Sequence, residues 1–302
     1  MLPIKKSGLI IVPCHSIWKH SLFDHDFLNF GQLSDHWFVA PFQYEGNDHL
    51  AFIKHGLKAI HLIADNLSNE SLVVFSGSQT KPQAPCISEA QSYYLLMYKL
   101  IDEYQKNWKA VSEVFNDDDI INYLQKINSI LIRKETTLDE LFLNSIATEE
   151  FALDSFENLL FSIYRFKQLK HEYPTDITIV GFGFKETRFL DYHAKAIDFP
   201  KEHINYVGVD PLPTNYSAQQ LDQYYNDLKM LEHRNALKLF AVDWYGSRTS
   251  LASKKRSRNP FNRYPGYHNV SLFDLEISFD DDEKFFDNYI SGVMPWSTPK
   301  NK

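Results

Sequence analysis

The stretch Leu72-Val73-Val74-Phe75-Ser76-Gly77-Ser78-Gln79-Thr80 joins four apolar residues directly to a polar segment. The apolar run predicts a buried strand, and the polar segment predicts a loop at its carboxyl end. Ser88-Glu89-Ala90 then begins a helix rich in aromatic residues. In open α/β sheets, ligands bind beyond the carboxyl ends of the strands, so a binding site is expected first at this loop.

Further apolar runs alternate with helical patterns along the chain. Helical spacing is clearest between Leu50 and Ile63, in a segment around 117–131 and between Ala218 and Leu237, and Thr148-Glu149-Glu150 is expected to lead into another helix. The alternation predicts an α/β fold, a Rossmann-like three-layer sandwich with a mostly parallel sheet. The strands are expected at Gly8 to Val12, residues 71–76, Ile177 to Val180 and Ile204 to Val209.

The domain organisation follows from where this alternation stops. We expect a Rossmann-like α/β domain over residues 1–245, with a helical insertion near 106–147, and a C-terminal extension over 246–302 that packs on it. The extension carries a basic block from Lys254 to Arg263, which fits a nuclear-import signal, an anion-binding arm or a solvated loop. The neighbouring Asn259-Pro260-Phe261 favours ordered packing.

Composition limits the classes of function. The 302 residues carry a net charge of -8, which argues against nucleic acid as the main partner because a phosphate backbone attracts basic proteins. Only two cysteines occur, too few for a disulfide framework or a thiolate metal site, so a reducing, cytoplasmic location is expected. No apolar run approaches the ~20 residues of a membrane helix, so no membrane partner is expected. Composition leaves the oligomeric state open.

The polar loop and the start of the following helix supply candidate ligand-binding groups. Gly77 permits a close backbone approach to a ligand, and the hydroxyl groups of Ser76, Ser78 and Thr80 suit phosphate oxygens. A structural turn is the alternative. Ser88 is expected to cap the helix. Glu89 can accept a proton as a catalytic base, bind a ribose hydroxyl or hold a divalent cation, or it is only a favourable charge at a helix N-terminus.

A second polar group lies inside an otherwise apolar helix. Asp154, Ser155, Glu157 and Asn158 fall within five residues, and the spacing of four places Asp154 and Asn158 on one face. So many short polar side chains need a ligand or internal hydrogen bonds to the loop of residues 76–80. Both interpretations stay open at this point.

Cationic and titratable side chains follow the other strands. Lys185 and Arg188 are expected on the first turn of a helix, where a bound anion would relieve their unfavourable position against the helix dipole, unless they pair with Glu89 or Glu157. His15 follows the first strand and can act as a catalytic general base or a neutral donor, although a lone histidine is more often structural.

Three blocks of these residues resemble the motifs of the ElyC/SanA/YdcF-like family, domain of unknown function 218, in its soluble fungal and plant branch. In order over about residues 8–210, they are Ser76-Gly77 with Ser88-Glu89-Ala90, then Asp154 to Asn158, then Lys185 with Arg188. Arg258-Asn259-Pro260-Phe261 also resembles fungal members. The resemblance implies a Rossmann-like fold with a polar cleft formed by these loops, and no particular reaction. Ser78 and Lys185 depart from bacterial members, which typically have glycine and histidine there.

Two functions therefore compete. The first is a hydrolase or transferase that acts on a phosphorylated or nucleotide-like small molecule, with Glu89 or His15 as acid or base and Lys185 and Arg188 holding the anion. The second is a non-catalytic module that binds a nucleotide or S-adenosylmethionine, a ligand to which bacterial relatives have been linked. Either a divalent cation or S-adenosylmethionine is a possible cofactor, and the identity of any metal ligands stays unknown.

Overall fold

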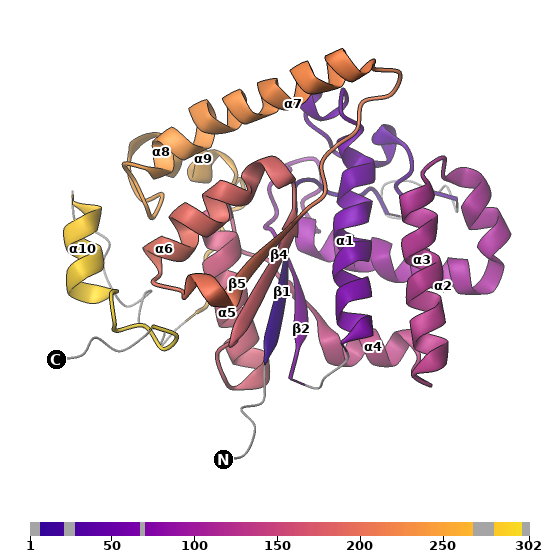
Figure 1. Cartoon of the computed structure of the whole chain (residues 1–302), viewed down its shortest axis with the longest axis horizontal. Helices are drawn as coiled ribbons and strands as arrows, with labels where there is room; N and C mark the ends of the chain where they lie inside the picture. Colours follow the sequence, from indigo (N-terminus) through magenta and orange to yellow (C-terminus); the bar gives the residue numbers. More distant parts are fainter. Residues whose placement is uncertain (1–6, 21–27, 67–69, 268–280, 298–302) are drawn as a thin grey trace.

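Five parallel strands form one sheet in the order β3-β2-β1-β4-β5 (Figure 1). The computed structural model describes residues 7–20, 28–66, 70–267 and 281–297. Pro13 of β1 pairs with Ser76 of β2, and Ser76 pairs with Glu149 of β3, so the carboxyl ends of these strands lie level. The strands are β1 Gly8–Pro13, β2 Leu72–Ser76, β3 Ile146–Glu149, β4 Asp176–Gly181 and β5 Ile204–Gly208.

Helices cover both faces of the sheet, which makes three layers (Figure 1). Four helices lie on one face: α1 Asp48–Asp65, α2 Glu89–Val114, α3 Asp118–Arg133 and α4 Leu138–Ser145. On the other face lie α5 Ser155–Lys170, a π-helix Arg188–His193, α6 Ala194–Ala196 and α10 Asp282–Tyr289. Figure 1 shows α7 crossing above the carboxyl ends of the strands. It spans Ala218–Glu232 and is followed by a π-helix His233–Leu237, α8 Lys238–Phe240 and α9 Thr249–Ser257.

Each face of the sheet has its own apolar core. Strand residues alternate between the two cores because successive side chains point to opposite faces: Val73 and Phe75 pack under α1 and α2, whereas Leu72 and Val74 pack under α5. All five residues of β2 are buried, as is usual for a central parallel strand. The sheet therefore holds the loops at its carboxyl edge in fixed positions.

The predicted α/β fold with its parallel sheet is confirmed, and the helix expected after Thr148-Glu149-Glu150 is present as α5. Two local features differ from expectation. Ile146–Glu149 is the edge strand β3, which the sequence did not predict. These four residues do not alternate between apolar and polar side chains, so the sequence pattern does not predict a strand. Their extended conformation comes from pairing with β2. The helix expected from Ala218 to Leu237 is present over that range, as α7 to Glu232 and then as a π-helix to Leu237. After β4 the chain forms a 3₁₀ turn, Gly183–Lys185, and then a π-helix, not one regular helix turn.

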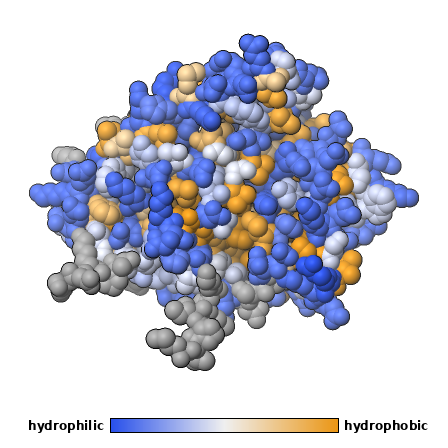
Figure 2. All heavy atoms as spheres, in the orientation of Figure 1, coloured by the Kyte–Doolittle hydropathy of each residue, from blue (hydrophilic) through white to orange (hydrophobic). Residues whose placement is uncertain are grey.

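The segment after residue 245 contributes to the same core as the sheet. Leu251, Tyr267, Phe285 and Ile290 are buried in the cluster that also contains Leu9 of β1. Figure 2 shows that hydrophilic residues cover most of the face seen there, with hydrophobic residues visible between them in the middle. Among the described residues, no helix combines the length and the apolar character that crossing a membrane requires.

Candidate functional site

The carboxyl ends of β1 and β4 lie side by side, at the point where the strand order changes direction. The chain runs from β1 through α1 to β2, whereas β4 lies on the opposite side of β1 and leads to β5. Such a switch point is where open α/β sheets bind ligands. His15 follows β1 and Lys185 follows β4, so both sequence-predicted residues flank this point.

Aromatic rings fix the positions of His15 and Lys185. The His15 ring stacks on Phe182 at 4.9 Å between centroids, and Phe182 stacks on Phe184 at 5.2 Å. The Lys185 Nζ atom lies 4.8 Å from the centre of the Phe182 ring, a cation–π distance. Both polar groups therefore lie against one buried aromatic side chain.

His15 is a neutral imidazole at neutral pH. Burial lowers its pKa well below the usual 6.5, and the charges of Lys185, His55 and Arg188 lower it further. Among the described residues, its Nε2 atom has no hydrogen-bond partner. A buried ring nitrogen without a partner costs free energy, so a ligand that hydrogen-bonds there would be stabilised.

Glu89 is a buried carboxyl group at the first position of α2. Ser88 caps this helix by accepting a hydrogen bond from the Gln91 backbone, as expected for an N-cap. Only 7% of Glu89 is exposed, and the Thr80 hydroxyl donates to its Oε1 atom at 2.5 Å. Burial raises the pKa of Glu89 above its usual 4.5, while Thr80, Lys81, Arg258 and Lys185 act in the opposite direction. Glu89 thus lies among cations from three parts of the chain.

Lys185 is a partly buried cation in this group. Burial, and next the charge of Arg188, lower the pKa of Lys185 to about 7. Asp48, at the start of α1, acts on it in the opposite direction, and burial raises the pKa of Asp48 itself to about 7. Sequence reasoning missed Asp48, whose only signal was its place at the start of a helical pattern. Below, "carboxyl-edge site" means His15, Thr80, Lys81, Glu89 and Lys185.

The loop after β2 uses its backbone N–H groups internally. Gly77 donates to the Glu149 carbonyl at 3.0 Å, and Ser78 donates to the Ala152 carbonyl at 3.0 Å. These N–H groups are therefore not available to an anion, contrary to the expected anion-binding loop. A Cβ atom on Gly77 would lie 2.9 Å from Glu89 Oε2, so glycine is needed for close packing beneath that carboxylate. The buried Ser78 hydroxyl lacks a hydrogen-bond partner within the described part of the chain.

Ser76 and Asn158 belong to a buried network around Glu149, which sequence reasoning did not single out as a site residue. The Ser76 hydroxyl donates to Glu149 Oε2 at 2.7 Å, and the Asn158 amide donates to the Ser76 hydroxyl at 2.9 Å. The Tyr267 hydroxyl donates to Glu149 Oε1 at 3.0 Å, and the Phe151 backbone donates to the same oxygen at 2.8 Å. For Ser76 and Asn158, the structure shows the internal hydrogen bonding that was one of the two interpretations.

Asp154 and Glu157 form an acidic pair at the start of α5, neutralised by the C-terminal segment. Asp154 caps the helix by accepting from the Glu157 backbone. The Lys255 Nζ atom lies 3.1 Å from Glu157 Oε1 and 3.6 Å from Asp154 Oδ2. Burial, and next the charge of Asp154, raise the pKa of Glu157 to about 7. The basic block is therefore ordered at Lys255, in contact with site residues.

Arg188 pairs with Glu232. The alternative partners expected from the sequence were Glu89 and Glu157. Both the Nε atom of Arg188, at 2.7 Å, and its Nη2 atom contact the Glu232 carboxylate. Its Nη1 atom donates to the Ser155 hydroxyl at 3.1 Å. With 13% of its side chain exposed, Arg188 has most of its hydrogen-bonding capacity satisfied within the protein. This arrangement favours a structural role over the expected anion contact.

Ser155 also forms a pair with His193, which resembles the nucleophile and base of a hydrolase. The Ser155 hydroxyl lies 2.8 Å from His193 Nε2. Burial and the charge of Arg188 both lower the pKa of His193, which is the reverse of what the carboxylate does in a Ser-His-Asp triad. A histidine beside an arginine is a poor proton acceptor, so the pair is better explained as part of the Arg188–Glu232 network.

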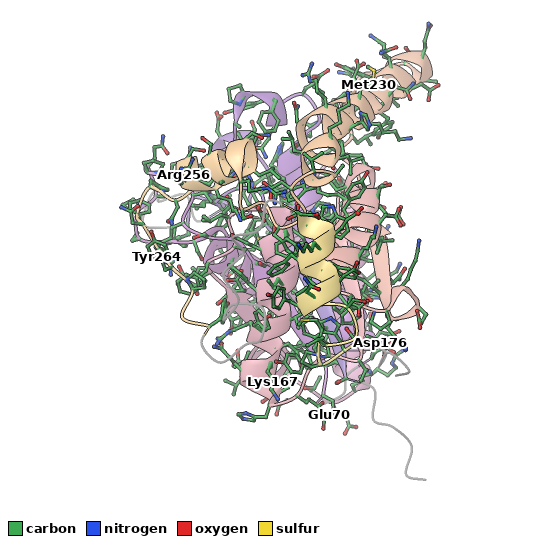
Figure 3. All side chains as sticks on the ribbon, turned by 90° about the vertical axis from the view of Figure 1, so that its left-hand side faces the viewer. Glu70, Lys167, Asp176, Met230, Arg256 and Tyr264 are labelled. Carbon is green, nitrogen blue, oxygen red and sulfur yellow. The ribbon has the colours of Figure 1, made fainter. Side chains whose placement is uncertain are left out.

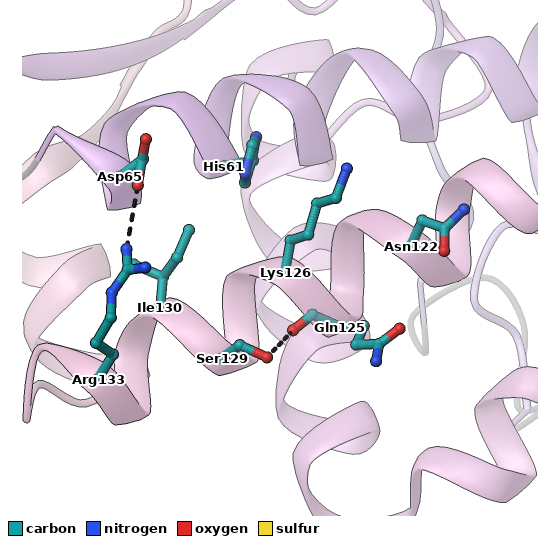
Figure 4. Close-up of a pocket in the computed structure, with 8 residues that line it drawn as sticks. All are labelled: His61, Asp65, Asn122, Gln125, Lys126, Ser129, Ile130 and Arg133. Atoms are coloured by element: carbon teal, nitrogen blue, oxygen red, sulfur yellow. Dashed lines mark hydrogen bonds and ion pairs between the residues drawn. The ribbon is translucent and has the colours of Figure 1, made fainter.

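Two further features bear on ligands. Within the described residues, no group of three or more His, Cys, Asp or Glu side chains is placed to hold a metal ion. Figure 4 shows the side chains that line a groove between α1 and α3. The groove has a volume of about 510 Å³, and its lining residues are different from those of the carboxyl-edge site. Its lining residues are His61, Asp65, Asn122, Gln125, Lys126, Ser129, Ile130 and Arg133.

The chain is similar over nearly its whole length to a yeast protein. The uncharacterized protein YOR238W of Saccharomyces cerevisiae is 50% identical to it over 303 aligned residues, which cover 98% of this chain and 99% of the yeast protein. No family model matches the chain. No solved structure matches it.

Proposed function

The chain belongs to one family with the yeast protein YOR238W, and we propose that its carboxyl-edge site binds a phosphorylated or nucleotide-like small molecule and acts on it as a hydrolase or transferase. Lys185 holds the anionic group of this molecule. Glu89 and His15 transfer protons to and from the reacting atoms. The cytoplasm, where thiols stay reduced, is the proposed location, which suits the free thiols of Cys14 and Cys86.

One observation carries this proposal. The charge of Lys185 acts on both Glu89 and His15, although the three residues follow different strands and are far apart in sequence. A cation and a neutral imidazole thus lie against the same Phe182 ring at the switch point of the sheet, and the charge of Lys185 also acts on the buried Glu89 carboxyl group. Perturbed titratable groups of opposite kinds in one place are typical of catalytic sites.

The proposed chemistry assigns one role to each side chain. The Lys185 ammonium attracts a phosphate oxygen and counters the charge that develops there during transfer. The Glu89 carboxyl group, whose pKa is raised by burial, holds or releases a proton closer to neutral pH than an exposed glutamate does. The unpartnered Nε2 atom of His15 accepts a proton or a hydrogen bond from the attacking hydroxyl or water.

The first experiment identifies the ligand. Native mass spectrometry of the full-length purified protein measures the mass of any small molecule it retains, and phosphorus analysis of the released molecule gives its class. A phosphate-bearing molecule supports the proposal. A retained molecule without phosphate, such as S-adenosylmethionine, would overturn the anion assignment and favour the binding-module alternative.

The second experiment separates catalysis from recognition. We expect Glu89→Gln to abolish phosphate release from a panel of nucleotides and sugar phosphates while it preserves binding, measured by calorimetry. Glu186→Gln is the control, because Glu186 is an exposed residue next to Lys185. Equal turnover in Glu89→Gln and wild type, or no turnover of any compound by the wild type, would contradict the catalytic role.

A further inference from the structure

The C-terminal segment of residues 246–267, here called the arm, is anchored beside the carboxyl-edge site. Its Lys255 pairs with Glu157, its Arg263 donates to the Glu150 carbonyl at 3.0 Å, and its Arg258 donates through Nη1 to the Leu153 carbonyl at 3.0 Å. All three contacts are with the chain that follows β3. Figure 3 shows Arg256 of the arm in the same half of the molecule as Met230 of α7, and away from Glu70 and Asp176, which lie at the amino ends of strands.

Arg258 is placed next to the loop that precedes Glu89. Leu153, which accepts its hydrogen bond, follows Ala152, whose carbonyl accepts the Ser78 backbone N–H of that loop. The Arg258 guanidinium is close enough to act on the pKa values of Glu89 and Lys185. Its backbone partner Leu153 follows β3, whereas Lys185 follows β4, so the two cations approach the carboxyl-edge site from different strands.

Arg258 differs from the other cations in its surroundings. Lys255 and Arg188 are each within 3.1 Å of a carboxylate, and Arg263 lies 4.0 Å from Glu150. In the part of the chain that the structure describes, Arg258 has no carboxylate partner, and its side chain is exposed. A guanidinium presents five N–H donors in a fixed plane that matches a phosphate group, and only one of its nitrogen atoms is occupied by the Leu153 carbonyl.

We propose that Arg258 is a second anion-binding residue of the carboxyl-edge site, and that the ligand carries two linked phosphate groups, as in a nucleoside diphosphate or pyrophosphate. This inference rests on the proposed function. The strand ends next to the two cations, β3 and β4, are three strand spacings apart, which is about 14 Å at about 4.8 Å per strand. Lys185 and Arg258 therefore reach the site from opposite sides, and their long side chains shorten this span. Two cations on opposite sides of one ligand match the two phosphate groups of a diphosphate. The arm is then part of the site.

The test measures binding of inorganic phosphate and inorganic pyrophosphate to the full-length protein by calorimetry. We expect tighter binding of pyrophosphate than of phosphate by the wild type. Arg258→Gln weakens pyrophosphate binding about tenfold or more, because a charge-assisted bidentate contact is lost. The affinity of Arg258→Lys for pyrophosphate is expected to lie between those of the wild type and Arg258→Gln, since lysine keeps the charge and lacks the planar donors. Arg256→Gln is the control, because Arg256 is an exposed arginine in the last turn of α9, two residues before Arg258, and this variant is expected to bind as the wild type does.

The outcomes separate the two proposals. If the wild type binds neither anion, the proposed function fails. If it binds pyrophosphate and Arg258→Gln binds it equally well, this inference fails and the proposed function stands. Equal affinity of the wild type for phosphate and pyrophosphate overturns the assignment to a diphosphate. Melting curves of each variant confirm folding, and Arg258→Lys keeps the test informative if Arg258→Gln is unstable.

Discussion

The Arg188–Glu232 ion pair provides a sharp test of the site geometry. Replacing Arg188 with Met removes the guanidinium and leaves the Glu232 carboxylate, only 6% exposed, without its two charged hydrogen bonds. Breaking a buried pair in this way lowers the free energy of unfolding by about 3–5 kcal/mol. Because 13% of the Arg188 side chain is exposed, we expect a loss at the lower end, about 3 kcal/mol. At about 2 °C per kcal/mol, the melting temperature falls by about 6 °C.

The assay is urea unfolding of the full-length chain, followed by circular dichroism. The double variant Arg188→Met/Glu232→Met is expected to regain most of the lost free energy of unfolding, because a well-packed apolar pair replaces the buried charges. The control is Arg133→Met at the exposed Arg133–Asp65 pair, whose side chains are 65% and 54% exposed. That variant is expected to lose less than about 1 kcal/mol.

Three results would contradict this reasoning. A loss below about 1 kcal/mol in Arg188→Met would mean that the pair does not stabilise the fold in solution. A double variant as unstable as the single one would mean that the lost packing, and not the unpaired carboxylate, causes the effect. A normal stability together with lost ligand binding would return Arg188 to the anion-binding role expected from the sequence.

Three further predictions concern the surroundings of Glu89. Gly77→Ala is expected to lower the free energy of unfolding by about 1–3 kcal/mol, because the new Cβ atom would lie 2.9 Å from Glu89 Oε2. In the control Gly266→Ala, the Cβ atom would have no other atom within 4 Å, so the urea midpoint should change little. Because burial raises the pKa of Glu89 above 4.5, this carboxyl lowers the free energy of unfolding as pH rises through and above that value. Urea unfolding at several pH values between 5 and 8 should therefore show that the free energy of unfolding depends less on pH in Glu89→Gln than in the wild type. An unchanged dependence on pH would exclude a raised pKa of Glu89. Tyr267→Phe removes the hydroxyl that donates to Glu149 and should cost about 1 kcal/mol in the same assay, with no loss contradicting the network.

Much of the candidate site was predictable, but the roles within it were not. Glu89, His15 and Lys185 were identified because each follows an apolar run, and the ends of parallel strands meet at one edge. Arg188 was identified by the same logic, and Asn158 as a polar residue in an otherwise apolar helix, but the structure gives both internal partners. A local pattern places a side chain at an edge without showing which distant group will satisfy it.

The partners that decide these roles are far away in the sequence. Glu232 is 44 residues from Arg188, Tyr267 is 118 residues from Glu149, and Arg258 is 105 residues from Leu153. No spacing rule links such pairs, because their contact depends on how α7 and the arm fold back over the sheet. β3 was missed for a related reason, since its conformation comes from pairing with β2.

The sequence by itself determined the layered α/β architecture and the edge at which the polar loops gather. It could do so because buried strands and amphipathic helices are encoded in local runs of apolar residues, with periods of two and 3.6. Only the tertiary structure decided which polar groups at that edge bond within the protein and which remain for a ligand. Ser76, Gly77 and Asn158 form hydrogen bonds within the protein, whereas Lys185 and Arg258 lack a carboxylate partner in the described part of the chain. The physical reason is that hydrogen bonds and ion pairs are satisfied by proximity in space, and a sequence pattern fixes proximity only within one element.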